Sequence, residues 1–363
     1  MRASSLLTLR NLIFAAVLSG VSLLAGCGLS LAASAGSGGA LPNPVRTIAG
    51  AAGVRGSADG TGDTASFSNP QGIVAVGTNL YIADTDNNAI RKLDMVTGAV
   101  TTFATGFNSP HGIASDGTNL YVADTYNSAI QKIVISTGVV SLLTGVVGVQ
   151  GSTDNPPGPA QFNYPYGIAT DGTNLYVADT YNETIRKVVI ASGVVTTLAG
   201  ATGLIGSVNG VGAAARFFFP YGIATDGTNL SISDFGNSTI RQLVLGTNAV
   251  TTIAGQVGVT GSADGTGAAA AFNEPTGVAT DGTTLAIADT YNHTIRQMVL
   301  GTGAVTTVAG EPGVAGSVDG GKFSSTGLYP IPPARLSCPV GIAVASGVIY
   351  VADSGNNVIR EIQ

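Results

Sequence analysis

A motif of about two dozen residues recurs six times along this chain of 363 residues. Its best-preserved copy runs from Pro165 to Lys187 and contains the core Leu-Tyr-Val-Ala-Asp-Thr. Each copy begins at a proline, and successive prolines are 40, 55, 55, 55 and 64 residues apart: Pro70, Pro110, Pro165, Pro220, Pro275 and Pro339. Self-similarity of this kind specifies a repeat architecture, because each unit must bury its apolar face against a neighbouring unit.

Each unit contains four short apolar segments separated by turn residues. In the unit that starts at Pro165 the segments are 167–170, 175–178, 184–190 and 194–199, and Asp171-Gly172 is typical of a tight hairpin turn. The first two segments are apolar at nearly every position, which predicts strands buried on both faces. The chain is therefore predicted to be an all-β, six-bladed β-propeller with four-stranded antiparallel blades. A solenoid is the alternative, but its ends would need polar caps.

The two ends of the repeat region complement each other. Residues 45–50, Val-Arg-Thr-Ile-Ala-Gly, match the fourth segment of a unit, as in Val195-Thr-Thr-Leu-Ala-Gly200. The last unit runs only through a third segment, Val358-Ile-Arg-Glu-Ile-Gln363. The strand at residues 45–50 is thus predicted to complete the last blade and to close the ring.

Residues 1–26 are predicted to be a targeting segment. Arg2 and Arg10 precede an apolar run, Leu12 to Leu24, that is short for a membrane span. The run ends in Leu-Ala-Gly-Cys27, which resembles the lipobox of bacterial lipoproteins. The resemblance implies acylation of Cys27, no partner for Cys338, and, with Gly28 next, sorting to the outer membrane. An ordinary secretory signal or a signal anchor are the alternatives. Residues 27–44 are expected to form a flexible tether.

The repeated elements Pro-x-Gly-Ile/Val, Leu-Tyr-Val-Ala-Asp-Thr-x-Asn and Ile-Arg-Lys resemble those of the NHL-repeat family of six-bladed propellers. The resemblance covers residues 45–363, with blades starting near residues 70, 110, 165, 220, 275 and 339. WD-type propellers fit poorly, because the chain contains no Trp. With 15 basic and 21 acidic residues the formal charge is −6, so no nucleic-acid partner is expected. A monomer that reaches the membrane only through its lipid is expected.

Polar residues that recur in every unit are interpreted as framework. An aspartate occupies one position in all six units: Asp84, Asp124, Asp179, Asp234, Asp289 and Asp353. An arginine seven residues later is predicted to pair with it, except in the second unit, which has Gln131. The long connections between units carry one Asp or Asn each, expected in Asx-type turns because one carboxylate is too few for calcium: Asp59, Asp154, Asn209, Asp264 and Asp319. An aromatic before most of the prolines, such as Phe162, is predicted to pin each connection to the blades.

The positions that vary between units are the candidates for function. The residue after each repeated proline should line the mouth of the central channel: Gln71, His111, Tyr166, Tyr221, Thr276 and Val340. Aromatics in the turns between the second and third strands are expected around it: Tyr126, Tyr181, Phe235 and Tyr291. The one short connection, 105–109, should leave a gap in the rim beside His111. Aromatics with a few polar groups suit a glycan, peptide or protein segment. The alternative is that these tyrosines only pack between blades.

A metal site is not predicted. Peptide-amidating lyases of the NHL class are similar in placing a zinc-ligating His after such a proline, but only His111 matches, and catalytic zinc takes three protein ligands. The acid and Asn cluster of propeller lactonases has no counterpart here. His293 is expected to be solvated in a turn. Calcium or zinc at the channel mouth stays open as an alternative.

Three functions follow from the sequence. The first is a non-enzymatic, lipid-anchored propeller of the bacterial cell envelope that presents a binding face, with no cofactor. The second is a propeller-type hydrolase or lyase with a metal near His111. The third is a scaffold within a larger envelope complex.

Overall fold

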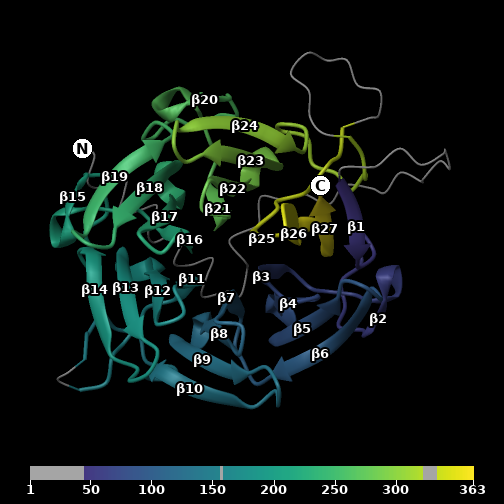
Figure 1. Ribbon diagram of the computed structural model, residues 1–363, viewed down its shortest axis with the longest axis horizontal. Helices are drawn as coiled ribbons and strands as arrows, with labels where there is room; N and C mark the ends of the chain where they lie inside the picture. Colours follow the sequence, from purple (N-terminus) through teal and green to yellow (C-terminus); the bar gives the residue numbers. More distant parts are fainter. Residues whose placement is uncertain (1–44, 156–157, 322–332) are drawn as a thin grey trace, which may run out of the picture.

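Six antiparallel sheets stand around a common axis in the computed structural model, which describes residues 45–155, 158–321 and 333–363 (Figure 1). The leader, Cys27 and the tether lie outside the described residues. Within those ranges, no helix is long and apolar enough to cross a bilayer. The predicted all-β six-bladed propeller is confirmed.

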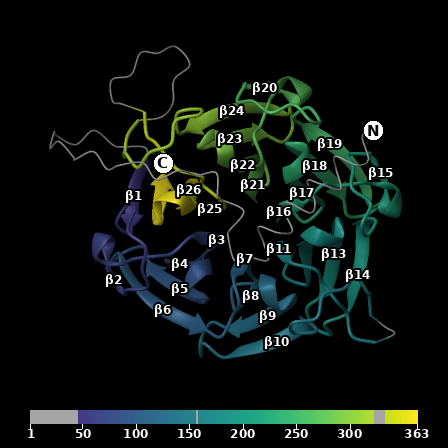
Figure 2. The same cartoon turned by 180° about the vertical axis from the view of Figure 1, so that it is seen from behind.

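Each of the first three blades has four strands in sequential order, the first of them nearest the axis (Figure 2). The first blade is β3 (Pro70–Val76), β4 (Asn79–Asp84), β5 (Ala89–Asp94) and β6 (Ala99–Thr105). The second is β7 (Pro110–Ser115), β8 (Asn119–Asp124), β9 (Ala129–Val134) and β10 (Val140–Gly145). The third is β11 (Pro165–Thr170), β12 (Asn174–Asp179), β13 (Thr184–Val189) and β14 (Val195–Gly200).

The remaining blades follow the same order until the last. The fourth is β16 (Pro220–Thr225), β17 (Asn229–Asp234), β18 (Thr239–Val244) and β19 (Ala249–Ala254). The fifth is β21 (Pro275–Thr280), β22 (Thr284–Asp289), β23 (Thr294–Val299) and β24 (Ala304–Ala309). The sixth is β25 (Gly341–Ala345), β26 (Val348–Asp353), β27 (Val358–Ile362) and β1 (Val45–Ala49). Two-residue strands add a fifth, outer strand to three blades: β2 (Gly60–Thr61), β15 (Gly210–Val211) and β20 (Gly265–Thr266).

Single turns of 3₁₀-helix link the second and third strands of every blade, on one face of the ring. They are η2 (Thr85–Asn87), η3 (Thr125–Asn127), η4 (Thr180–Asn182), η6 (Phe235–Asn237), η8 (Thr290–Asn292) and η9 (Ser354–Asn356). The other three lie in the connections between blades: η1 (Gly62–Thr64), η5 (Gly212–Ala214) and η7 (Gly267–Ala269).

Glycine allows the innermost strands to crowd at the axis. A Cβ added at Gly112 would overlap the carbonyl oxygen of Tyr166 in the next blade, and one added at Gly167 would overlap that of Tyr221. The same overlap with the following blade arises at the equivalent glycines Gly72, Gly222, Gly277 and Gly341. The invariant glycine after each variable residue is therefore a close-packing requirement.

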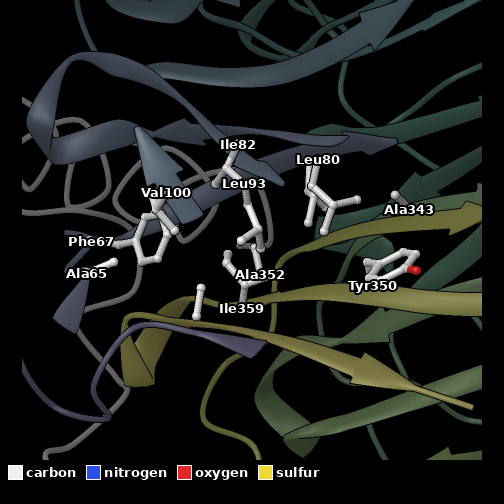
Figure 3. Close-up of a cluster of buried hydrophobic side chains, with 12 residues drawn as sticks. Ala65, Phe67, Leu80, Ile82, Leu93, Val100, Ala343, Tyr350, Ala352 and Ile359 are labelled. Carbon is white, nitrogen blue, oxygen red and sulfur yellow. The ribbon is translucent and has the colours of Figure 1, made fainter. Parts of the chain in front are cut away.

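The strand from the beginning of the described chain closes the ring. β1 pairs antiparallel with β27, with Val45 opposite Ile362 and Thr47 opposite Arg360. Figure 3 shows the seam beside it, where Ile359 and Ala352 of the last blade pack against Ile82 and other side chains of the first. The predicted closure is confirmed, although the strand ends at Ala49 and Gly50 turns away with φ of 91°.

A buried ion pair holds each long connection onto its blade. In the third blade, Arg186 Nη1 donates to Asp179 Oδ2 at 2.6 Å, and its Nη2 donates to Asp154 Oδ1 of the connection at 2.7 Å. The guanidinium lies 5.2 Å from the centre of the Phe162 ring. The Asp–Arg pair recurs in the other paired blades as Asp84–Arg91, Asp234–Arg241, Asp289–Arg296 and Asp353–Arg360. The first three of these arginines also lie over a phenylalanine ring, whereas the last blade has Leu336 at the aromatic position. The predicted framework role of these residues is confirmed.

The prediction of self-contained Asx turns in the connections is wrong. Each connection's Asp or Asn accepts instead from the buried arginine at 2.7 to 3.3 Å and from an outer-strand threonine hydroxyl at 2.9 to 3.3 Å. The second blade supplies the internal control. Its connection is short, has no such acid, and Gln131 replaces the arginine, bonding Asp124 at 3.3 Å. The arginine is present where there is a loop for it to hold.

Candidate functional site

The residues after the repeated prolines meet at the axis. Gln71, His111, Tyr166, Thr276 and Val340 are each at most 9% exposed, and Tyr221 is half-buried. All six line a hollow of about 620 Å³ on the face that carries the 3₁₀ turns. We call this hollow the cup. This volume includes the solvent-filled opening of the cup.

A hydrogen bond across the axis forms the floor of the cup. Tyr221 of the fourth blade donates its hydroxyl to Gln71 Oε1 of the first blade at 2.9 Å, and these blades face each other in a ring of six. A second hollow of about 440 Å³ lies beyond the floor. It is lined by residues that follow the repeated prolines and by the next residues of the innermost strands. The channel is thus divided in two at this level, which the sequence did not indicate.

The floor continues as a chain of hydrogen bonds toward the rim. Gln71 Nε2 donates to Asn69 Oδ1 at 2.9 Å, and Asn69 Nδ2 donates to Asp86 Oδ1 at 3.2 Å. Asp86 also lies 3.8 Å from the exposed guanidinium of Arg55. The polar wall on the first blade is therefore fixed in orientation before any ligand arrives.

His111 is a neutral acceptor in the wall of the cup. Its Nδ1 lies 2.9 Å from the carbonyl oxygen of Ser109, so Nδ1 must carry the proton and Nε2 is left as an acceptor. The ring packs edge-on to Tyr166 with centroids 4.4 Å apart. Burial lowers the pKa of His111 to about 4, which keeps the imidazole uncharged at neutral pH.

Aromatic side chains form two arcs over the second to fourth blades. The inner arc runs from His111 through Tyr166 and Tyr221 to Phe235, with successive ring centroids 4.4 to 5.9 Å apart. The outer arc has centroids 5.0 to 5.3 Å apart and consists of Tyr126, Tyr164, Tyr181, Phe219 and Phe218.

Of the ten residues predicted to line the channel mouth or to stand around it, nine line the cup. Tyr181 does not; it lies in the outer arc between Tyr164 and Phe219. Phe235 reaches the cup because it replaces a framework threonine. In other blades the threonine after the repeated aspartate donates to the carbonyl of the next blade's proline, as Thr180 does to Pro220 at 2.7 Å. In the fourth blade Ser233 makes the inter-blade bond instead, to Thr276.

The sequence reasoning missed the position before each proline. These residues all have φ between 43° and 53°, a left-handed conformation that is unusual for bulky side chains: Asn69, Ser109, Tyr164, Phe219, Glu274 and Cys338. Asn69 and Ser109 line the cup, and Tyr164 and Phe219 belong to the outer arc. The available signal was that this position varies between units as much as the position after the proline.

A latch across each blade boundary holds most of these left-handed residues. The residue that follows the 3₁₀ turn accepts a hydrogen bond from the backbone N–H of the residue before the next proline, as Glu183 Oε2 does from Phe219 N at 2.7 Å. Asn88, Asn357, Ser238 and His293 do the same, whereas Ser128 Oγ has no partner among the described residues. His293 is therefore not merely solvated as expected: it is half-buried, and its Nδ1 accepts from Cys338 N at 3.1 Å.

Protonation of His293 is expected to weaken the seam between the fifth and sixth blades. Burial lowers the pKa of His293 below 6.5, so its contribution to stability is complete above pH 6.5 and is lost as the pH falls. His293→Asn copies the latch of Asn88 and Asn357 without titrating. Between pH 7 and pH 5, wild type should lose up to about 1 kcal/mol more unfolding free energy than the variant, the half-exposure of the ring keeping the effect small. Parallel urea-unfolding curves for the two proteins would contradict the latch.

Cys338 is buried and is disulfide-bonded, and the described residues contain no free cysteine. This departs from the prediction that lipid on Cys27 leaves Cys338 without a partner. Among the described residues there is also no group of three or more His, Cys, Asp or Glu side chains that could hold a metal ion. Besides His111, the described residues that line the cup carry neutral amide, hydroxyl, aromatic and aliphatic side chains and one carboxylate, that of Asp86.

Comparison with known proteins identifies the repeat. The model described as "NHL repeat" matches residues 107–133 and 336–361. The chain is 30% identical over 333 residues to Protein SUPPRESSOR OF QUENCHING 1, chloroplastic, of Arabidopsis thaliana, covering 86% of this chain and 26% of that protein. It is 27% identical over 300 residues to NHL repeat-containing protein 2 of Homo sapiens, covering 69% of this chain and 41% of that protein. The chain thus spans well under half the length of these relatives.

Solved structures show the same fold. A protein of unknown function from Bacteroides thetaiotaomicron superposes with a TM-score of 0.70 at 23% identity, over 87% of this chain and 74% of that one. An auxiliary nutrient binding protein from the same organism gives 0.69 at 18% identity, over 88% and 76%. A virginiamycin B lyase from Staphylococcus aureus gives 0.52 at 15% identity, over 82% and 95%. The chain is a six-bladed β-propeller that carries NHL repeats at residues 107–133 and 336–361.

Proposed function

We propose that this protein is a non-enzymatic binding protein of the bacterial cell envelope, and that the cup is its binding site. The observation that carries the proposal is the contrast between framework and cup. The buried Asp–Arg pairs repeat almost unchanged around the ring, whereas the residues that converge on the cup differ from blade to blade. A single asymmetric hollow on a symmetric scaffold is the arrangement that a specific ligand needs.

The auxiliary nutrient binding proteins among the propellers of similar fold support a binding role. The preformed floor supports it too, because Tyr221 and Gln71 are already oriented by their mutual bond. Binding to such a surface loses little free energy to ordering of side chains.

Ligand-induced stabilisation tests the proposal. Thermal melting of the purified domain is measured against a panel of oligosaccharides, peptides and small metabolites, and hits are repeated with a Tyr166→Ala/Tyr221→Ala variant. We expect at least one compound to raise the Tm of wild type and to leave the variant unchanged. Lys187→Met, a substitution on the third strand of the third blade that leaves the cup intact, serves as the matched control. Hits that stabilise all three proteins equally would place binding elsewhere and overturn the proposal.

A hydrolase or lyase with a metal near His111 is the competing function. Metal content of the domain purified without chelator separates the two. Zinc or calcium bound at one equivalent, and lost in a His111→Ala variant, would replace the binding proposal with the enzymatic one. Binding of ligand with no stoichiometric metal supports the binding protein.

The anchor proposed for this protein is lipid on Cys27, and it has a direct chemical test. A thioether to lipid and a disulfide use the same sulfur, and the chain has only two cysteines. Intact mass of the protein extracted from membranes should show the acyl groups, and a Cys27→Ala variant should leave the membrane fraction. A non-acylated mass with no titratable thiol until reductant is added would overturn the anchor and leave the cup proposal untouched.

A further inference from the structure

The walls of the cup divide into an aromatic side and a polar side. Tyr126, Tyr166, Tyr221 and Phe235 come from the second to fourth blades. The first blade supplies instead a run of short polar side chains: Asn69, Gln71, Thr85 and Asp86. A ligand that fills the cup must therefore present an apolar face to one side and hydrogen-bonding groups to the other.

Charge at the cup excludes anions. Among the described residues, no Lys or Arg lines the cup, whereas Asp86 does. Glu274 lies beside Tyr291 of the lining and helps raise the pKa of that phenol. Burial raises the pKa of Glu274 as well, and no salt bridge to it is formed among the described residues. His111 adds no positive charge, and the exposed guanidinium of Arg55 lies outside the lining, 3.8 Å from Asp86, so the residues that line the cup offer a carboxylate or phosphate ligand no cation of their own.

The polar groups that remain available are neutral and numerous. The Tyr221–Gln71–Asn69–Asp86 chain uses one donor and one acceptor of each amide and leaves a second N–H and a second lone pair on each. His111 Nε2 adds an acceptor, and three residues that carry hydroxyls, Ser109, Tyr126 and Tyr166, line the same hollow. Alternating donors and acceptors of this kind match vicinal hydroxyls, each of which both donates and accepts.

The rim is open on one side. Between β6 and β7 the connection has only residues 106–109, whereas the connections before the third, fourth and fifth blades have about twenty residues each. Ser109 at the end of this short connection lies in the cup, and Tyr126 joins the cup to the outer arc. A chain-like ligand can leave the cup through this gap and continue along Tyr126 and Tyr164.

We propose that the cup binds a neutral oligosaccharide, with sugar faces packed on the aromatic side and hydroxyls bonded to the polar side. The inference rests on the proposed function and specifies its ligand class. Uncharged hydroxyls satisfy the neutral donors and acceptors, and the apolar C–H faces of sugar rings suit tyrosine and phenylalanine. An amine ligand would be favoured by the acidic groups alone, but it would leave most of the hydroxyl and amide capacity of the cup unused.

Matched tetrasaccharides that differ in charge test this inference by calorimetric titration of the mature domain. The neutral probes are maltotetraose, cellotetraose, mannotetraose and N-acetylglucosamine tetramer; glucosamine tetramer is the cationic probe and tetragalacturonate the anionic one. We expect at least one neutral probe to bind, and both charged probes to bind at least about tenfold more weakly. Tyr166→Ala should weaken binding of the neutral probe at least about tenfold. Tyr221→Phe should weaken its binding less, because the aromatic ring is kept.

The outcomes are distinguishable from failure of the proposed function. Preferential binding of glucosamine tetramer would replace the neutral ligand with a cation, and preferential binding of tetragalacturonate would overturn the charge argument. If no saccharide binds while a peptide from the stability panel binds in a Tyr166-dependent way, the saccharide inference is wrong and the cup remains the site. Binding of a neutral probe that Tyr166→Ala leaves unchanged, in a variant with the wild-type melting temperature, would also overturn it.

Discussion

Arg186→Met is expected to lower the free energy of unfolding by about 3–5 kcal/mol, one of the two largest effects that we predict for a change in this chain. Arg186 is fully buried and donates to four oxygens: Asp179 Oδ2, Asp154 Oδ1 and the carbonyls of Gln161 and Thr153, at 2.6 to 3.0 Å. Methionine fills similar volume but leaves the carboxylate of Asp179 buried without its cation. The measurement is equilibrium unfolding in urea.

The matched comparisons come from the chain itself. Arg186→Gln copies the second blade, where Gln131 bonds Asp124 at 3.3 Å, and should cost less than methionine because the amide still donates. An Arg186→Met/Asp179→Asn double variant removes both charges and should recover part of the loss. Lys187→Met, the neighbouring cation, should change stability by less than about 0.5 kcal/mol.

The same variant should also release the connection before the third blade. Asp154 is 42% exposed and is held by Arg186 and by the outer-strand Thr197. Proteolysis near residue 154 is therefore expected to accelerate in Arg186→Met and not in Lys187→Met. A loss below about 1 kcal/mol with unchanged proteolysis would show that the pair is not the clamp described here.

Removing β1 is the second change expected to have a large effect. A chain that starts at Gly50 should lose about 5 kcal/mol or more relative to one that starts at Val45, a large part of the 5–15 kcal/mol typical of a folded domain. Val45 and Ala49 are buried, β1 supplies a whole edge ladder to β27, and Thr47 N donates to Asp319 at 2.9 Å. Loss of these contacts exposes the edge of β27 and the end of the seam in Figure 3.

Differential scanning calorimetry of the two proteins measures the effect, with an expected fall in Tm of about 10 °C or more. Because a shortened chain can fail to fold at all, a milder variant accompanies it. Thr47→Val removes the hydroxyl that bonds Asp319 Oδ1 at 2.9 Å while keeping the strand, and should cost about 1 kcal/mol. Coincident melting of the Gly50 and Val45 proteins would show that the ring does not depend on β1 for closure.

The repeat pattern was sufficient to predict most of the fold. The hairpin turns, doubly buried inner strands and matching ends implied six four-stranded blades closed by the first strand, because local patterns that recur six times leave few ways to bury their apolar faces. The pairing of Asp179 with Arg186 was equally readable, since a buried charge in every blade requires a partner. The aromatic before each proline, such as Phe162, is buried as expected.

The contacts between units could not be predicted from the sequence. His293 was expected to be solvated in its turn, but its Nδ1 accepts from an N–H of the next blade that lies 45 residues away in the chain. Glu183 likewise accepts from an N–H of the next blade, 36 residues away. The acids of the connections were assigned to local turns for the same reason: Asp154 meets Arg186 across 32 residues. Sequence proximity favours the local explanation, while the fold supplies a competing partner.

The sequence by itself determined the architecture and the framework of this protein, and it identified the set of residues that converge on the axis. Only the tertiary structure decided what that set forms. Tyr221 and Gln71 are 150 residues apart and meet because opposite blades face one another across the axis, which closes the channel into a cup. Two of the left-handed residues before the prolines, Asn69 and Ser109, become part of the site for the same reason. A local pattern sets backbone and burial, whereas the shape and chemistry of a site arise where different blades converge.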